Sequence, residues 1–312
     1  MVFPMSYYQQ ENRSKLGIGQ DGNALTMLIA VQLVAFVLLA FIKVIYYFTY
    51  GKEGLGIYED QVLNWVALPA HLPTLLTRPW TLLTHFFVHD GVWHILGNML
   101  WLWAFGYILQ DMTGNRKVIP IFLYGAFAGA MAYLVAFNLI PALGKNIEES
   151  RALGASAGVM AIAIAATALA PRYKIFPFIM GGIPLWVFTT VFVIIDLATI
   201  PYNNAGGHIA HLAGAAMGLL FITVLRRGVD WSDWMNNLFD WVTNLFNPDK
   251  PKKGKSVKSQ VFYKTKVPPF KKTTNLTQQR IDEILDKINQ KGYNSLTPDE
   301  KEILKRASNE DL

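Results

Sequence analysis

Ser156 and His211 are the residues of this 312-residue chain whose types most directly suggest chemistry. Each lies in an apolar run, where a polar group is costly unless it faces a cavity with water and polar partners. A serine hydroxyl beside an imidazole makes a nucleophile with its general base. The pair therefore predicts peptide-bond hydrolysis through an acyl-enzyme, carried out inside a membrane.

His94 and Asn98 form a second polar pair, four residues apart and so on one face of a helix. Two side-chain donors aimed at one cavity suit an oxyanion hole, completed by backbone N–H groups at the start of the Ser156 segment. Small residues recur every four positions around His211, which lets helices approach closely in lipid and favours contact with Ser156. They are Gly206, Ala210, Gly214 and Gly218.

The composition is typical of a multi-pass membrane protein, since 52% of the residues are hydrophobic. The chain has no cysteine, which excludes disulfides, thiolate catalysis and cysteine metal sites. We therefore expect an all-α membrane protein with a bundle of six transmembrane helices. The apolar segments are 24–48, 91–110, 118–140, 156–170, 178–200 and 206–225.

The segment 156–170 is about 22 Å long as a helix, shorter than the roughly 30 Å of bilayer hydrocarbon. Ser156 is therefore expected below one membrane surface. Residues 51–90 are interrupted by three prolines and are expected to lie in the interface rather than to cross. Basic residues are concentrated in the loops at the other end of the bundle. By the positive-inside rule this distribution predicts that both termini are cytoplasmic.

The chain divides by composition into an N-terminal arm, a six-span domain and a tail of three parts. Residues 231–246 alternate apolar and polar faces at helical spacing, which predicts an interfacial amphipathic helix. Between Lys250 and Lys272 there are nine lysines and no acid, which favours anionic lipid rather than nucleic acid as a partner. The predicted boundaries are 1–23 (arm), 24–228 (six-span domain), 229–248 (amphipathic helix), 249–275 (basic linker) and 276–312 (small helical module).

Three motifs in order resemble the rhomboid intramembrane serine proteases, of the bacterial type with six transmembrane helices. They are residues 84–99 (THFFVHDGVWHILGNM), 154–158 (GASAG) and 210–218 (AHLAGAAMG). The resemblance covers roughly residues 20–228. It implies a rhomboid-like bundle and a Ser–His dyad without cofactor or metal, which cleaves transmembrane protein substrates near the outer face of a bacterial cell membrane.

The resemblance also implies a role for each motif residue. Ser156 would be the nucleophile and His211 the general base, while His94, Asn98 and the Gly154 loop would hold the oxyanion. His85 and His89 would support the loops around the cavity. The chain departs from the family at two positions, since Thr81 follows Trp80 where arginine is common, and Met160 stands where an aromatic residue often stacks on the histidine.

Two alternatives remain open from the sequence. A rhomboid-like protein without activity could bind transmembrane clients, although such relatives have usually lost the serine or the histidine. The spacings His85-x-x-x-His89 and His208-x-x-His211 also occur in metal sites, so a histidine-ligated membrane metalloprotein is the other class. Asp196, within the segment 178–200, would either pair locally or take part in function.

Overall fold

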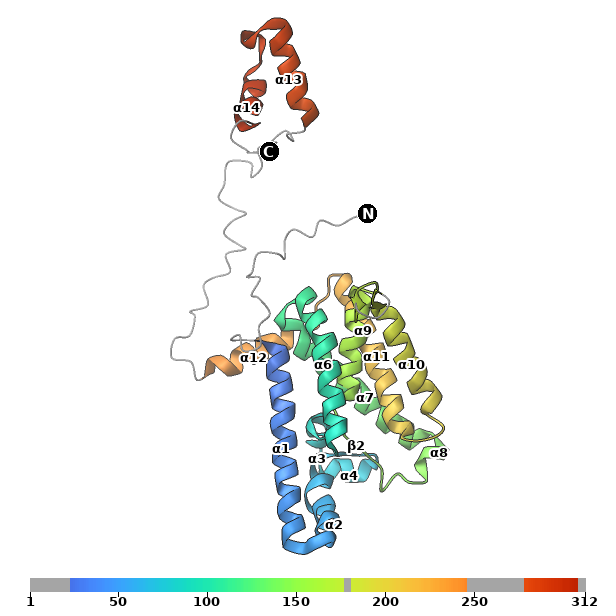
Figure 1. Ribbon diagram of the computed structural model, residues 1–312. Coiled ribbons are helices and arrows are strands. Elements are labelled where there is room, and N and C mark those ends of the chain that lie inside the picture. The colour runs from blue at the N-terminus through green and yellow to red at the C-terminus, as the bar shows by residue number, and fades with distance from the viewer. Residues whose placement is uncertain (1–22, 177–180, 246–277, 308–312) are drawn as a thin grey trace. The chain divides into compact units, whose positions relative to one another are not determined.

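The computed structural model describes residues 23–176, 181–245 and 278–307 (Figure 1). They fall into two units, divided between Phe246 and Asn247. The arm 1–22 and the basic linker lie outside the described residues. The first unit holds the apolar segments, and the second holds the C-terminal helices.

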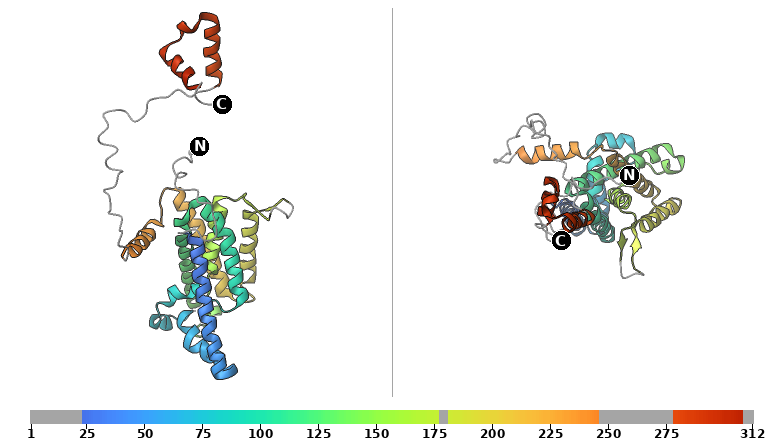
Figure 2. Two further views of the ribbon diagram at one scale, coloured as in Figure 1. Left: turned by 60° about the vertical axis from the view of Figure 1, so that its left-hand side comes forward. Right: turned by 90° about the horizontal axis from the view of Figure 1, so that it is seen from above.

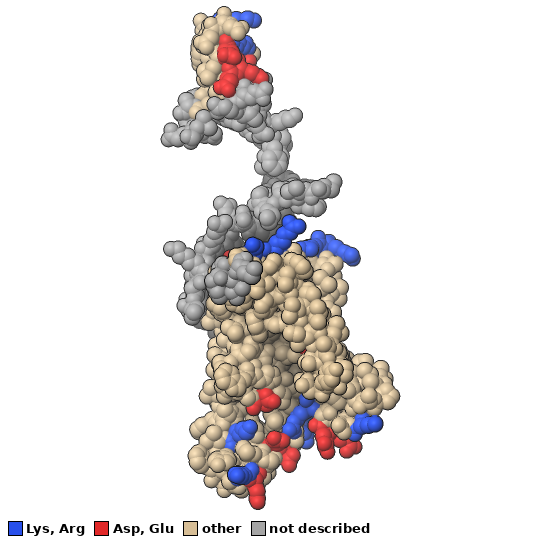
Figure 3. Space-filling view, turned by 45° about the vertical axis from the view of Figure 1, so that its right-hand side comes forward, with Lys and Arg blue, Asp and Glu red and all other residues tan. Residues whose placement is uncertain are grey.

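Helices form the first unit, which confirms the expected all-α membrane fold. Helical runs that begin at Ala24, Val92, Asn115 and Ala205 are long and apolar enough to cross a bilayer, and two shorter apolar helices begin at Ser156 and Leu185. The bundle helices are α1 (Ala24–Tyr50), α6 (Val92–Thr113), α7 (Asn115–Leu139), α9 (Ser156–Leu169), α10 (Leu185–Thr199) and α11 (Ala205–Arg226). On the face shown in Figure 3, charged side chains gather toward the two ends of this unit, and the surface between them is largely uncharged.

The short helix α9 is the centre of the bundle, packed against α6, α7 and α11. Its alanines let the neighbouring backbones come close, and Ala161, Ala165 and Ala166 have no exposed surface. On α11, a β-carbon at Gly214 would lie 2.2 Å from the Ala157 carbonyl oxygen, so only glycine fits there. Close packing of small residues, rather than hydrophobic burial, is what joins helices in lipid.

The first loop, between α1 and α6, contains only short elements. Arg78 stabilises part of this loop. Its guanidinium lies 4.4 Å from the centre of the Trp65 ring and donates to the Asn64 carbonyl at 2.8 Å. Trp80 stacks on Trp65. The elements are η1 (Gly51–Glu53), α2 (Gly54–Tyr58), η2 (Glu59–Leu63), α3 (Asn64–Val66), β1 (Leu68–Pro69), α4 (Leu72–Thr77), α5 (Thr81–Thr84) and η3 (His85–Phe87).

Two short antiparallel strand pairs fix loops at opposite ends of α9. Strand β1 pairs with β2 (Arg151–Ala152), in the register Leu68 to Ala152, and so joins the first loop to the chain just before Ser156. Helix α8 (Pro141–Gly144) precedes β2. Strand β3 (Lys174–Ile175) pairs with β4 (Ile183–Pro184), so α10 begins at Leu185 and not near residue 178 as the apolar pattern suggested.

Helix α12 (Asp233–Leu245) runs across the direction of the bundle helices (Figures 1 and 2). The turn before it is anchored in the bundle, because Lys117 forms an ion pair with Asp230 and donates to Ser232 at 2.8 Å. Burial alone raises the pKa of Asp230, but its hydrogen bonds with Lys117 and Ser232 outweigh burial, so the pKa is lowered. The exposed apolar residues of α12 include Trp234, Leu238, Phe239, Trp241, Val242 and Leu245.

The second unit is a pair of helices, α13 (Gln278–Lys291) and α14 (Pro298–Ala307), joined through η5 (Tyr293–Ser295). Its small core consists of Ile284, Leu296 and Ile303. Helix α14 begins with a capping box, since Thr297 N–H donates to the Glu300 carboxylate at 2.8 Å and Glu300 N–H donates to the Thr297 hydroxyl at 3.3 Å.

Candidate active site

Ser156 and His211 meet at the end of the bundle that carries the first loop. The Ser156 hydroxyl lies 2.6 Å from Nε2 of His211, within hydrogen-bond distance, although 55 positions separate the residues. Ser156 is the first residue of α9, and His211 lies near the start of α11. The close packing of Gly214 on Ala157 holds the two helices together beside this contact, because Ala157 follows Ser156 directly and Gly214 lies one helical turn after His211.

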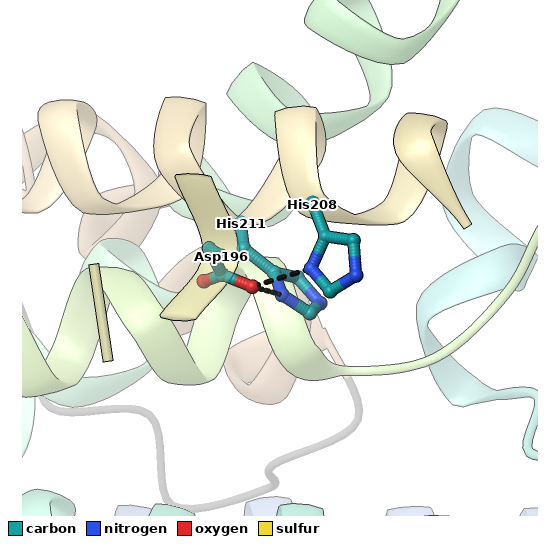
Figure 4. A group of neighbouring side chains, drawn as sticks. All are labelled: Asp196, His208 and His211. Atoms are coloured by element: carbon teal, nitrogen blue, oxygen red, sulfur yellow. Dashed lines mark hydrogen bonds and ion pairs between the residues drawn. The ribbon is translucent and has the colours of Figure 1, made fainter. Parts of the chain in front are cut away.

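The other ring nitrogen of His211, Nδ1, is within hydrogen-bond distance of a carboxylate. Its Nδ1 lies 3.0 Å from Oδ1 of Asp196 on α10, and Nδ1 of His208 lies 2.7 Å from the same oxygen (Figure 4). Asp196 is buried, with 7% of its surface exposed. The sequence left its role open, although an acid within an apolar helix is itself a signal of a specific partner.

His94 and Gly154 face each other across the site. A β-carbon at Gly154 would lie 2.9 Å from Nε2 of His94, and the backbone of Gly154 has a φ of +110°, so a side chain there would strain the backbone and displace the His94 ring. Nδ1 of His94 is 2.8 Å from the carboxylate of Asp90. The side-chain amide of Asn98 donates to the His94 carbonyl at 3.0 Å.

His85 and His89 hold the loop that leads into Ser156. The carbonyl of His85 accepts from Gly154 N–H at 2.9 Å, and Nε2 of His89 accepts from Ala155 N–H at 3.5 Å. Burial lowers the pKa of His85 to about 4, and burial together with the neighbouring His94 lowers the pKa of His89 to about 4. Both rings are therefore neutral at pH 7.

A single cavity of about 600 Å³ joins these groups. Ser156, His211, His94, Asn98 and Gly154 all line it, so the structure brings the predicted site residues to one place. Small residues of α7 and α11 line part of the cavity together with Tyr133, and Trp93, Trp101 and Arg151 line other parts. The small residues include Ala126, Gly129, Ala130, Gly207 and Ala210.

Of the two histidine pairs that the sequence offered as metal ligands, only His208 and His211 lie in a cluster of possible ligands within the described part of the chain. Among the described residues, the cluster with metal-ligand spacing is Asp196, His208 and His211, with ligand atoms within 4.8 Å of one another. His85 and His89 are not part of it, and Nδ1 of His85 instead lies 2.9 Å from the Thr81 carbonyl. Every ring nitrogen of His208 and His211 has a hydrogen-bond partner, the weakest being Asn203 at 3.4 Å. Hydrogen bonding alone accounts for this cluster.

Comparison with known proteins matches residues 76–228 to the rhomboid domain and residues 270–310 to a family of unknown function (DUF6576). The chain is 30% identical over 156 residues to Rhomboid protein 1, mitochondrial, of Saccharomyces cerevisiae, covering 46% of this chain and 41% of that protein. It is 27% identical over 157 residues to RHOMBOID-like protein 12, mitochondrial, of Arabidopsis thaliana, covering 47% of each. The chain thus spans less than half the length of these curated relatives. Ser156 and His211 lie within the matched domain.

Proposed function

The chain belongs to the rhomboid family, and from this premise we propose that it is an intramembrane serine endopeptidase acting through Ser156 and His211. The observation that carries the proposal is the 2.6 Å distance between the Ser156 hydroxyl and Nε2 of His211 at the wall of a cavity. That distance suits direct proton transfer from nucleophile to base.

In the proposed reaction, Ser156 attacks the carbonyl carbon of the scissile peptide bond while His211 takes the hydroxyl proton. The tetrahedral intermediate collapses as His211 returns the proton to the leaving amine, which leaves an acyl-enzyme. His211 then activates water, and hydrolysis of the ester frees Ser156. These steps need no cofactor.

The oxyanion would lie near Gly154, with His94 and Asn98 as side-chain donors. Because Nδ1 of His94 faces the Asp90 carboxylate at 2.8 Å, that nitrogen carries a proton. His94 can then donate from Nε2 only when both ring nitrogens carry a proton. The amide of Asn98 has a second N–H besides the one bonded to the His94 carbonyl, and that N–H is the candidate donor.

The proposed substrates are transmembrane segments of membrane proteins. A peptide bond within a helix hides its carbonyl in the helical hydrogen bonds, so the segment has to unwind locally before attack. Helix α9 has 14 residues, about 21 Å, which supports a position of Ser156 below the surface of a roughly 30 Å hydrocarbon layer when the other end of α9 lies at the opposite interface. A cut there falls near the membrane face on the side of the first loop.

We further propose a bacterial cell membrane with both termini cytoplasmic, which makes the cleavage face the outer one. The basic loops support this orientation, since exposed Arg116, Arg172, Lys174 and Arg226 lie at the ends of the helices away from Ser156. The named relatives are mitochondrial, so the membrane itself is tested by locating a tagged chain. Protease accessibility of tags at each terminus tests the orientation.

Labelling by a fluorophosphonate tests the proposed function directly. We expect the purified full-length protein to be labelled and the Ser156→Ala and His211→Ala variants not to be, with all three equally folded. His94→Ala and Asn98→Ala are expected to lower turnover of a transmembrane test substrate by about 10–10³-fold, the range for one oxyanion donor. Labelling that survives in Ser156→Ala would remove the protease proposal. A well-folded wild type that neither labels nor hydrolyses would favour the client-binding alternative.

A further inference from the structure

We propose that Asp196 is a positioning residue for His211 and completes a hydrogen-bonded chain Ser156–His211–Asp196, in place of the dyad that the family resemblance implies. This inference rests on the proposed function. Its geometric basis is that Asp196 reaches across from α10 to a histidine on α11, at 3.0 Å, while the same histidine reaches Ser156 on α9 at 2.6 Å. Hydrogen bonds between polar side chains therefore link the three helices α9, α11 and α10.

The two histidines favour the ionised carboxylate of Asp196. Nδ1 of His211 and Nδ1 of His208 both approach the same oxygen, Oδ1, at 3.0 and 2.7 Å. A single oxygen can carry at most one proton, so it cannot donate to both rings, whereas an ionised carboxylate accepts an N–H from each of them. Asp196 is also the one charged residue of α10, so its burial requires such partners.

The carboxylate in turn determines which nitrogen of His211 is the base. Because Oδ1 accepts, the proton of the neutral ring sits on Nδ1, and the lone pair sits on Nε2, which faces the Ser156 hydroxyl. The opposite tautomer would set a lone pair against the carboxylate and an N–H against the nucleophile. Asp196 thus presents His211 to Ser156 in the tautomer that can take a proton, and it stabilises the imidazolium that follows.

His208 supports the carboxylate from the second side. The two imidazole rings are nearly perpendicular, with centroids 5.9 Å apart, so both reach Asp196 without stacking on each other. This second donor keeps Asp196 in place between α10 and the start of α11. His208 therefore acts on the reaction only through Asp196, one step further from the nucleophile.

The test is Asp196→Asn in the full-length protein, measured by kcat and KM on a transmembrane test substrate. Asparagine keeps the size but removes the charge, and its N–H₂ group can stabilise the wrong tautomer of His211. In soluble serine proteases the matching change lowers kcat by about 10⁴. Here we expect kcat to fall at least about tenfold with KM changed less than about twofold. Because a partly unfolded sample would also lower the apparent kcat without changing KM, kcat is calculated per folded molecule, with the folded fraction taken from the melting curve of each variant.

Thr189→Val is the matched control, since Thr189 is a buried polar residue of the same helix whose hydroxyl bonds only to carbonyls of α10. It is expected to keep kcat. If Asp196→Asn does not accumulate in membranes, Asp196→Ser, which also removes the charge but needs less space, takes its place.

The outcomes separate this inference from the proposed function. Full kcat in a folded Asp196→Asn, with Ser156→Ala and His211→Ala inactive, overturns the role of Asp196 and leaves the protease intact. Hydrolysis that persists in Ser156→Ala overturns the protease itself. Loss of wild-type activity on adding EDTA would make Asp196, His208 and His211 a metal site and would also overturn the inference.

Discussion

The backbone of Gly154 passes the His94 ring with no room for a β-carbon, and this contact can be tested by one methyl group. Gly154→Ala places that methyl 2.9 Å from Nε2 of His94 at a φ of +110°. We expect a loss of about 1–3 kcal/mol in the free energy of unfolding. We also expect a fall in kcat of about 10²-fold, because the displaced oxyanion groups lose alignment.

Gly56→Ala provides the comparison for Gly154→Ala. Gly56 is helical, and nothing lies within 4 Å of the position of its β-carbon. Alanine there should leave kcat unchanged and leave stability equal or slightly higher. Equal kcat in the two variants would show that the Gly154 loop is free to adjust and does not shape the site.

The buried histidines of the first loop predict how stability depends on pH. The pKa values of His85 and His89 are lowered to about 4 in the folded protein, against an ordinary value near 6.5. Between these values the unfolded chain binds more protons than the folded one. Stability is therefore fully present above pH 6.5 and falls as the pH drops toward 4, by roughly 3 kcal/mol for each histidine.

Chemical unfolding in detergent from pH 7 to pH 4 measures this effect, with His85→Gln as the comparison. The variant lacks one of the two titrating groups, so its stability should fall less steeply over that range. Equal slopes for wild type and His85→Gln would mean that His85 does not remain neutral in the fold.

At the scale of helices, the contact between α9 and α11 controls the distance from Ser156 to His211. Gly214→Ala would force a β-carbon to 2.2 Å from the Ala157 carbonyl oxygen and so push α11 away from α9. We expect kcat to fall at least about tenfold along with a loss of thermal stability, since reacting groups lose alignment over short displacements.

Two further substitutions on α11 distinguish an effect on the Ser156–His211 distance from an effect on stability alone. Gly218→Ala makes the same clash with Ala161, one turn further from the site, so it should lower the melting temperature with a smaller effect on kcat. Ala216→Val adds bulk at an exposed position of α11 and should change neither. If Gly214→Ala and Gly218→Ala reduced kcat equally, the helix contact would matter only through stability.

The elements that the sequence predicts well are those with a polar residue in an apolar run. Ser156, His211, His94 and Asn98 stand out because lipid disfavours them, and the small residues around His211 indicate which helices approach. The bond from Asp196 to His211 could not be predicted in this way. Apolar residues lie on every face of α10, so the hydrophobic pattern does not show which face meets α11. The β3–β4 pair, which delays the start of α10 to Leu185, also has no hydrophobic signal of its own.

At the scale of the whole chain, the site and the anchor of α12 lie at opposite ends of the first unit. Gly129 of α7 packs on Ala157 beside the nucleophile, whereas Lys117 binds Asp230 near the start of the same helix. These positions are 12 residues, or about 18 Å, apart along α7. The exposed Trp234 and Trp241 of α12 suit the bilayer interface at the end away from the site.

This separation predicts that the tail and the reaction can be uncoupled by truncation. A chain that ends after Phe246 keeps the whole first unit and should retain the wild-type kcat and melting temperature, because the helices beyond it have their own core.

A chain that ends after Val229 loses Asp230 and Ser232, the partners of the half-buried Lys117, and loses Trp231 from its contact with Phe221. It should melt several degrees lower yet still hydrolyse a test substrate at low temperature. In the full chain, Asp230→Asn should reproduce part of that loss of stability. A folded chain ending after Val229 without any hydrolysis would show that α12 acts on the catalytic end across the bundle, because loss of the anchor alone leaves Ser156, His211 and their packing on α7 in place.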